Sequence, residues 1–416
     1  MATTAYKCPA CGAGIGFDPE KQLFKCEYCL SEYTKEQISE QTAAEEQEEP
    51  ISATRENGEL GENYLSYTCK NCGAEVFADE NTVADHCYYC HSPVVCSGRL
   101  NGELKPRYIV PFAYDKEEAE NRFLKFAKKK WFVPKSFFAE KQVEKIQGVY
   151  YPFWLCDADV NATSTANAQN TRTWVVGKNR YTETKHYKLY RCGDIHFEDV
   201  ATGAFDKESK EILEGVLPYP TDALREFSPE YLSGYLAKKR TVEHDDMLGE
   251  VEKRINDYSK KILHDTMTGY DAVQQQNTRV QMKSVLWDYA LMPLWMLTYK
   301  KKGKIYPYAM NGHTGKVYGE LPLSIPKLMI LLFSVFFGVT LICSLFGMLL
   351  PGLLFGALAG GISALCVWLS YGSKVHGSTY PLEEFSKLNL TDSRDNFVTK
   401  NVTVVRIPDP PPSAKK

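Results

Sequence analysis

Two copies of one cysteine pattern near the N-terminus constrain this chain more than any other feature. Each copy has a Cys-x2-Cys pair, a gap of fourteen residues and a second Cys-x2-Cys pair, and the copies are offset by 61 residues. The eight cysteines are Cys8, Cys11, Cys26, Cys29, Cys69, Cys72, Cys87 and Cys90. The repeated spacing indicates an internal duplication.

The cysteines predict a closed tetrahedral metal site in each copy, the arrangement of a zinc ribbon. Each Cys-x2-Cys turn aims two thiolates at one point, and two such turns complete a four-sulfur site that suits Zn²⁺. Because no coordination position stays open, we expect the metal to hold the fold and not to catalyse. A segment of about 30 residues buries too little core to fold alone, so zinc should supply folding energy.

Disulfides and a rubredoxin-like iron site are the alternatives to zinc. The residues before Cys8 contain no apolar signal segment, which is typical of a compartment that keeps thiols reduced. The Cys8-Pro9-x-Cys11-Gly12 order is the one feature that favours iron. We therefore predict two structural Zn²⁺ sites.

Charge is distributed unevenly along the chain. Residues 1–99 contain seven Lys and Arg against seventeen Asp and Glu, a formal charge of −10, whereas the whole chain carries −3. The remainder therefore carries +7. Binding to nucleic acid depends on Lys and Arg that neutralise phosphates, and thiolate-bound zinc makes the ribbons more negative still. We expect the ribbons to bind a protein and not nucleic acid.

Composition divides the 416 residues into six segments and predicts a multidomain α+β fold. The segments are zinc ribbon 1 over 1–34, an acidic linker over 35–63, zinc ribbon 2 over 64–99, an α+β cytosolic domain over 105–323, a transmembrane helical hairpin over 328–371 and a cytosolic tail over 372–416. The linker is rich in Glu, Gln and Ala, so we expect the two ribbons to move independently of each other.

Three helices are predicted within the α+β domain. Asp115-Lys116-Glu117-Glu118 has the spacing of a capping box and begins a helix that ends in Lys128-Lys129-Lys130. Ser228-Pro229 has the first residues of a helix that leads to Lys239, and Thr241–His264 is typical of a long charged helix.

Two similar β-prone stretches, Tyr150–Leu155 and Leu291–Met296, each contain Pro-x-Trp. The second continues to a turn at Lys301–Lys304 and returns as Ile305–Met310. The motif favours two related α+β modules and is equally consistent with two core strands that each bury a tryptophan.

Two uncharged stretches predict a membrane hairpin. Leu328–Leu350 has 23 residues without charge, Pro351-Gly352 interrupts, and Leu353–Tyr371 gives 19 more. Each is close to the roughly 20 residues that cross a bilayer core. Gly356-x3-Gly360 and Ala357-x3-Gly361 permit close packing of the second span against the first, or against another copy of the chain in a homo-oligomer.

The lysines around this hairpin predict its orientation. The lysines flanking the spans are Lys300, Lys301, Lys302, Lys304, Lys316, Lys327 and Lys374. The Pro-Gly turn has none. By the positive-inside rule, we expect a two-span protein of the cytoplasmic membrane with both termini in the cytosol.

No catalytic motif holds in this sequence. Gly312–Lys316 resembles a phosphate loop, but Met310 stands where a glycine is required and Val317 follows the lysine. His186, Cys192 and His196 are close in sequence, but structural roles explain them more simply. We therefore expect a protein that is not an enzyme and has no catalytic residues.

Several motifs occur in a characteristic order. They are the ribbons, Val110-Pro111-Phe112, Lys129–Pro134, Tyr150–Leu155 and Asn311–Val317, followed by the membrane hairpin. From Cys8 to about Tyr371 this order resembles a family of bacterial transcription-factor-IIB-type zinc-ribbon membrane proteins, often named after primosomal or replication helicases. The resemblance implies SPFH-domain, virion-core-like partners and phage-shock-type proteins that are docked to the cytoplasmic membrane.

Together these features favour a membrane-anchored zinc-ribbon adaptor that recruits a cytosolic protein. The alternatives are a membrane-tethered protein that binds nucleic acid or acts in transcription, and an enzyme or transporter accessory that acts through the α+β domain.

Overall fold

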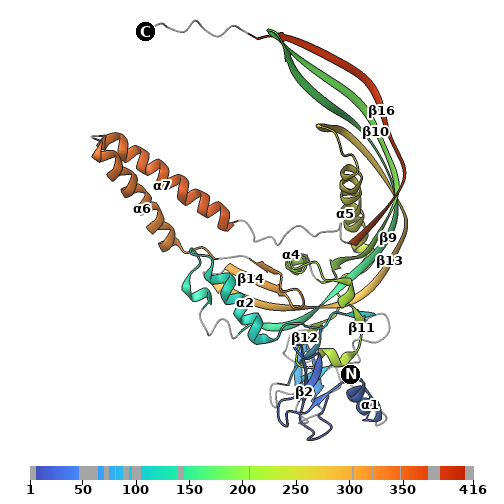
Figure 1. Ribbon diagram of the computed structural model, residues 1–416. Helices are drawn as coiled ribbons and strands as arrows, with labels where there is room; N and C mark the ends of the chain where they lie inside the picture. The colour runs from blue at the N-terminus through green and yellow to red at the C-terminus, as the bar shows by residue number, and fades with distance from the viewer. Residues whose placement is uncertain are drawn as a thin grey trace. The chain divides into compact units, whose positions relative to one another are not determined.

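The chain is a mixed α+β protein that forms two compact units (Figure 1). The computed structural model describes residues 6–45, 64–69, 75–79, 81–87, 93–95, 105–138, 145–205, 207–301, 304–319, 322–346, 348–372 and 385–407. Unit 1 consists of Met1–Trp154, Ala201–Glu243 and Asp288–Tyr380, and unit 2 of Leu155–Val200, His244–Trp287 and Pro381–Lys416.

The N-terminal module, which we define as residues 6–45, is a small antiparallel sheet followed by a helix. Its elements are β1 (Ile15–Asp18), β2 (Leu23–Cys26), β3 (Glu32–Tyr33) and α1 (Lys35–Glu45), with the strand order β1-β2-β3. Ile15 and Phe17 alternate with less buried residues along β1, as Phe24 and Cys26 do along β2. This period of two places one face of the hairpin in a small core.

This module packs against the rest of unit 1. The backbone N–H of Phe17 donates to the carbonyl of Ser233 at 3.2 Å, and the Ser233 hydroxyl donates to the carbonyl of Ile15 at 2.5 Å. The Phe17 ring meets Tyr231 edge to face at 5.3 Å, within the 3-10 helix η5 (Pro229–Leu232). The sheet edge of the first ribbon is therefore hydrogen-bonded to the rest of unit 1, and independent motion of the two ribbons stays a prediction.

The second cysteine copy contributes four strands. They are β4 (Tyr64–Thr68) paired with β5 (Glu75–Asp79), and β6 (Thr82–His86) paired with β7 (Pro93–Val95). The 61-residue offset places β5 over β1 and β6 over β2, so the duplication extends from cysteines to strands. β6 also pairs with β12 (Leu236–Lys238) and so joins the main sheet.

The main sheet runs in the order β11-β8-β13-β9-β12-β6-β7. The bounds not yet given are β8 (Tyr108–Ile109), β9 (Gln147–Val176), β11 (Arg225–Glu226), β13 (Ala272–Lys301), β14 (Lys304–Asn311) and β15 (Val317–Gly319). β13 and β14 pair from Leu294↔Asn311 to Lys301↔Lys304, which confirms the predicted hairpin. β9 and β13 each contribute residues to both units.

Both Pro-x-Trp motifs bury their tryptophans in unit 1. The indole N–H of Trp154 donates to the carbonyl of Val242 at 3.0 Å, and that of Trp295 donates to the carbonyl of Tyr114 at 3.2 Å. Phe112 lies 5.1 Å from the Trp295 ring and stacks on Tyr235 at 4.2 Å. Each motif is thus a core strand with a satisfied indole, and relatedness of the two modules stays a hypothesis.

The helices of the α+β region differ in how well their ends were predicted. α2 (Lys116–Lys128) begins as expected, because the Asp115 carboxylate accepts the N–H of Glu118 at 2.8 Å. α5 (His244–Asp265) buries every fourth residue from Met247 to Leu263, the stripe of an amphipathic helix. The shorter helices are η3 (Lys135–Phe138), α4 (Lys207–Gly215) and η4 (Thr221–Ala223).

The helix predicted from Ser228 to Lys239 is wrong. Pro229–Leu232 makes one 3-10 turn, Gly234 has φ +91°, and the chain continues as β12. The Ser228 hydroxyl bonds the carboxylate of Glu230 and caps no backbone N–H. Strand pairing of β12 with β6 and β9 therefore overrides the local helix signal.

Unit 2 is built on long strands and α5. β10 (Asn179–Gly203) pairs with β9 and, antiparallel, with β16 (Ser386–Arg406). The segment expected as a cytosolic tail, 372–416, thus contributes a 21-residue strand. Buried Arg191 on β10 donates to the carboxylate of Asp395 on β16 at 2.5 Å.

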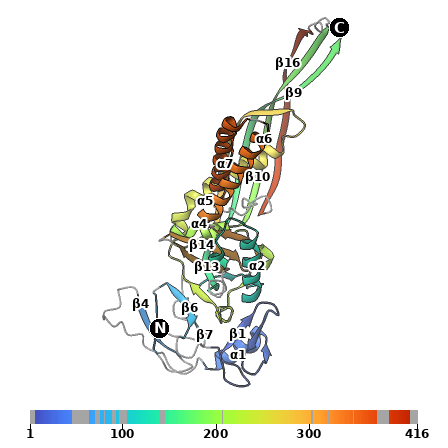
Figure 2. The ribbon, with the colours of Figure 1, turned by 90° about the vertical axis from the view of Figure 1, so that its left-hand side faces the viewer.

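Two apolar helices follow β15 in unit 1. They are α6 (Ile325–Leu345) and α7 (Leu349–Gly372), and they lie side by side (Figure 2). Pro351-Gly352, expected as the turn between them, lies in the first turn of α7, where proline is tolerated. The connection is instead Phe346–Met348.

Candidate metal centre

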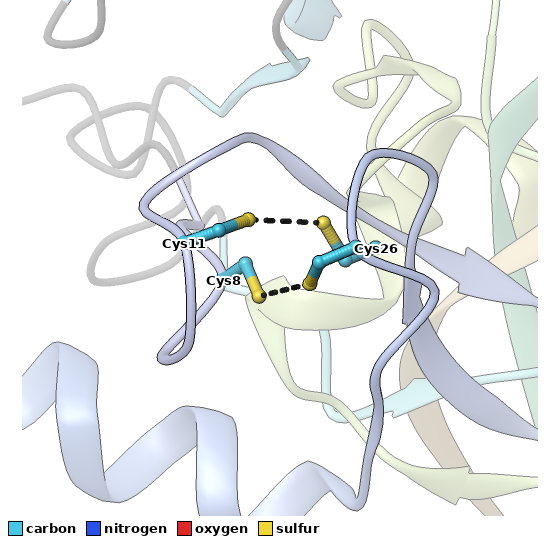
Figure 3. Close-up of side chains that lie close together, drawn as sticks. Cys8, Cys11 and Cys26 are labelled. Carbon is cyan, nitrogen blue, oxygen red and sulfur yellow. Dashed lines mark hydrogen bonds between the residues drawn. The ribbon is translucent and has the colours of Figure 1, made fainter.

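Four cysteines of the N-terminal module bring their sulfurs together (Figure 3). The Sγ atoms of Cys8, Cys11, Cys26 and Cys29 all lie within 4.8 Å of one another. Sγ of Cys8 is 3.4 Å from Sγ of Cys29, and Sγ of Cys11 is 3.6 Å from Sγ of Cys26. A tetrahedral metal with thiolates at about 2.3 Å has sulfur–sulfur edges of about 3.8 Å. The residues therefore fit a four-thiolate metal site.

Two turns of the backbone place these sulfurs. In the first, the N–H of Gly12 donates to the carbonyl of Cys8 at 2.8 Å, and Gly12 takes φ +73°. In the second, the N–H of Leu30 donates to the carbonyl of Cys26 at 2.9 Å, and Leu30 takes φ +62°. Glycine adopts this conformation without strain, whereas leucine pays for it. The second turn therefore has a leucine where glycine would be unstrained, which indicates that the Leu30 side chain itself has a role.

The surroundings of the cluster favour the thiolate form of Cys8 and Cys29 and the thiol form of Cys11. The Ser31 hydroxyl, 3.3 Å from Sγ of Cys29, and the Ser31 backbone N–H lower the pKa of Cys29 to about 6. Burial opposes ionisation of Cys8, yet the Tyr33 hydroxyl and backbone N–H groups lower the pKa of that thiol. The backbone N–H of Ala13 favours the Cys11 thiolate, but burial and the neighbouring thiols raise the pKa of Cys11 to about 12. A bound cation would favour the thiolate form of Cys11 as well, because a metal ligand has to be deprotonated.

Four thiolates would fill the coordination sphere of a tetrahedral metal and leave no position open for a substrate. Cys8 and Cys26 are buried, and Cys11 and Cys29 are exposed. A metal bound here would join the two turns and stabilise a module that has only a few buried apolar side chains.

The second predicted site lies partly outside the described residues. Cys69 and Cys87 are both buried, as their counterparts Cys8 and Cys26 are. Cys72 and Cys90 fall outside the described part of the chain. Assembly of the second site stays a prediction.

A cleft of about 950 Å³ lies beside the first cysteine cluster, within unit 1. Its charged lining is mostly acidic: Asp18, Glu20, Glu27 and Asp115 outnumber Lys25. Tyr28 and Leu30, at the second cysteine turn, border it with side chains that are 82% and 68% exposed. This surface was not predicted from the sequence. Its signal there was the pair of large apolar residues, Tyr28 and Leu30, on either side of Cys29.

The apolar helices are a second candidate site. By length and composition, both α6 and α7 are able to cross a membrane. A Cβ at Gly356 would lie 2.7 Å from the carbonyl oxygen of Phe336, and one at Gly360 would lie 2.9 Å from that of Leu332. A Cβ at Gly361 would meet nothing within 4 Å. Of the two predicted small-residue pairs, Gly356/Gly360 therefore packs against α6.

Two of the residues considered for catalysis, Lys316 and His196, have polar partners in the structure. Lys316 donates to the carbonyl of Leu217, and its pKa is lowered by burial. In unit 2, Asp159 accepts from Ser284 at 2.7 Å and lies 2.8 Å from Nδ1 of His196. A nucleophile triad requires histidine between serine and the acid, whereas here the acid lies between them.

Comparisons with known proteins add one relative. No family model matches the chain, and no solved structure matches it. Uncharacterized protein YdjG of Bacillus subtilis (strain 168) is 29% identical over 327 residues, which span 77% of this chain and 90% of the relative. The chain is thus similar to YdjG over most of the length of both proteins.

Proposed function

We propose that this chain is a membrane-anchored zinc-ribbon adaptor that recruits a cytosolic protein to the cytoplasmic membrane. The observation that carries the proposal is the exposed pair Tyr28 and Leu30, presented by the second turn of the four-cysteine cluster beside an acidic cleft. The same unit contains the two apolar helices, so one compact unit holds both the contact surface and the anchor.

Zinc is the metal that we propose for the cysteine cluster. Four thiolates in a tetrahedral arrangement suit Zn²⁺, which is not redox-active and whose structural sites are almost always tetrahedral. The duplication supports a second zinc at Cys69, Cys72, Cys87 and Cys90. Both zincs would be structural: they would fix the turns that carry exposed side chains.

The membrane anchor that we propose is the pair α6 and α7 crossing as a hairpin. Their side chains are apolar and mostly exposed among the described residues, as expected for helices that face lipid. Lysines flank both ends of the pair, and residues 346–352 carry no charge. Both termini would then be cytosolic, with Phe346–Met348 on the outer side.

A protein is the ligand that the cleft fits better than nucleic acid. The acidic lining repels phosphates, while an exposed aromatic and an aliphatic side chain are typical anchors of protein interfaces. A partner segment that combines basic and apolar residues would be complementary. The family resemblance suggests an SPFH-like or membrane-stress protein. The alternative, a membrane-tethered nucleic-acid-binding protein, would need cations that residues 1–99 do not supply in number.

Photo-crosslinking in cells tests this proposal. A benzophenone amino acid replaces Tyr28 in the full chain, and a matched variant carries it at Phe397, which is exposed in unit 2. We expect position 28 to form an adduct with one cytosolic protein, and replacement of Cys26 and Cys29 by serine to abolish it. Adducts with nucleic acid would favour the alternative, and identical adducts at both positions would contradict the adaptor function.

A further inference from the structure

The loop that follows α2 is unusually basic and carries an exposed tryptophan. Residues 125–135 contain five lysines and no Asp or Glu. Lys128 and Lys129 are exposed, and the Trp131 side chain is 59% exposed. None of these lysines has an ion pair among the residues that the structure describes. We call residues 128–131 the basic loop.

Hydrogen bonds fix this loop to the beginning of α6. The backbone N–H of Ser324, the residue before α6, donates to the carbonyl of Phe132 at 2.8 Å. Nζ of Lys327, in the first helical turn, donates to the carbonyls of Trp131 at 2.7 Å and Val133 at 2.8 Å. Val133 itself is fully buried. The basic loop and the end of the apolar helix therefore lie at the same level.

A groove that shares Lys129 with the basic loop adds one further cation, Lys125. This groove of about 490 Å³ is lined by Arg122 and Lys125 of α2 and by Lys129 of the basic loop. Nε of Arg122 is 2.7 Å from the carboxylate of Glu118, so the charges of these two side chains cancel. The two lysines remain as the cations of the groove.

A membrane surface explains this combination of residues. Tryptophan side chains prefer the level of the lipid headgroups, because the apolar ring contacts the acyl chains there while the indole N–H stays hydrated. Lysines near an anionic leaflet contribute about 1 kcal/mol each. A soluble protein partner would not require the loop to be held at the end of an apolar helix.

We propose that the basic loop is an interfacial anchor that binds the phosphate headgroups of anionic phospholipids around the N-terminal end of α6. The proposal rests on the proposed function, because it places that end of α6 at the membrane surface. It adds the lipid class that the chain selects, and the residues that select it.

The test measures lipid selectivity of the full chain in detergent. Phosphatidylglycerol and phosphatidylcholine are titrated separately, and bound lipid is counted by native mass spectrometry. We expect Lys128→Gln with Lys129→Gln to reduce the preference for phosphatidylglycerol by up to about 30-fold, or about fivefold per lysine. The matched control, Lys188→Gln with Lys253→Gln, removes two exposed lysines of unit 2 and should leave the preference unchanged.

An unchanged preference in the Lys128/Lys129 variant would overturn the inference. Displacement of phosphatidylglycerol by equimolar inorganic phosphate would also overturn it, because the site would then bind soluble phosphate. Alkaline carbonate washing of membranes tests the anchor separately. Release of the unmodified chain contradicts the proposed function, whereas retention with unchanged lipid preference contradicts this inference alone.

Discussion

Packing of α7 against α6 depends on the absence of a side chain at Gly356. A Cβ there would lie 2.7 Å from the carbonyl oxygen of Phe336 and 2.7 Å from Oγ1 of Thr340, whereas ordinary contact begins at 3.4 Å. The Thr340 side chain can rotate, but the Phe336 oxygen belongs to the helix backbone. Gly356→Leu must therefore move the helices apart by at least about 0.7 Å along this contact.

The expected cost of this separation follows from overpacking. Forcing an extra side chain into a well-packed contact costs about 1–3 kcal/mol, which shifts the opening equilibrium of the helix pair by roughly 5- to 150-fold. Gly361→Leu is the matched control, because a Cβ at Gly361 meets nothing within 4 Å. It adds the same side chain to the same helix without touching α6.

Alkylation of Cys343 reports the opening. Cys343 on α6 is half-buried, and a Cβ at Gly352 of α7 would lie 2.6 Å from its Cβ. N-ethylmaleimide should modify Cys343 faster in Gly356→Leu than in the unmodified chain or in Gly361→Leu, with exposed Cys366 as the internal reference. Equal Cys343 rates in the two leucine variants would refute the packing argument.

Three further predictions concern topology, the metal site and unit 2. A cysteine at Met348, between α6 and α7, should react with a membrane-impermeant maleimide added to intact cells, and labelling only after cell disruption would contradict the proposed topology. The Ser31 hydroxyl and backbone N–H lower the pKa of Cys29 and so favour the thiolate that would bind the metal, whereas protons compete with the metal for this sulfur. Acid should therefore release the metal, and Ser31→Ala should raise the midpoint of release by up to about one pH unit, read with a chromogenic chelator, while Ser39→Ala should not. Asp395→Asn should destabilise β16 by about 1–3 kcal/mol, because buried Arg191 loses its carboxylate partner. Faster amide exchange over residues 386–406 would report this loss, and Asp392→Asn should have less effect. The hydrogen bond from Arg191 lowers the pKa of Asp395 in the folded protein. The ion pair therefore stabilises the fold above the unfolded-state pKa of about 3.9, and this stabilisation is lost as pH falls through the lower folded pKa. Below that pH, amides of the unmodified chain and of Asp395→Asn should exchange at the same rate.

Local chemistry made part of this structure predictable from the sequence. The Asp115 cap, the Lys301–Lys304 turn and the first cysteine cluster depend on residues near one another in sequence or on fixed metal-ligand spacing. All three occur as predicted. The alternating and uninterrupted apolar patterns of β1 and α6 likewise follow from the environment of each element alone.

The elements that the sequence did not predict depend on pairing between strands that are far apart in the sequence. Ser228-Pro229 begins no α-helix, because β12 finds partners in β6 and β9, which lie far away in the sequence. β16 has an alternating Val-Thr pattern at its end, but only pairing with β10 distinguishes it from a tail. The cleft beside Tyr28 combines residues of the N-terminal module with His86 and Asp115, and no local pattern predicts that meeting.

The metal content of chain purified from carbonate-washed membranes tests the zinc ribbons and the membrane anchor together. We expect the full chain to stay in the membrane pellet and to carry two zinc atoms, with one lost when Cys26 and Cys29 are both replaced by serine. Chain that is released into the supernatant, or chain that contains iron or no metal, would contradict this expectation.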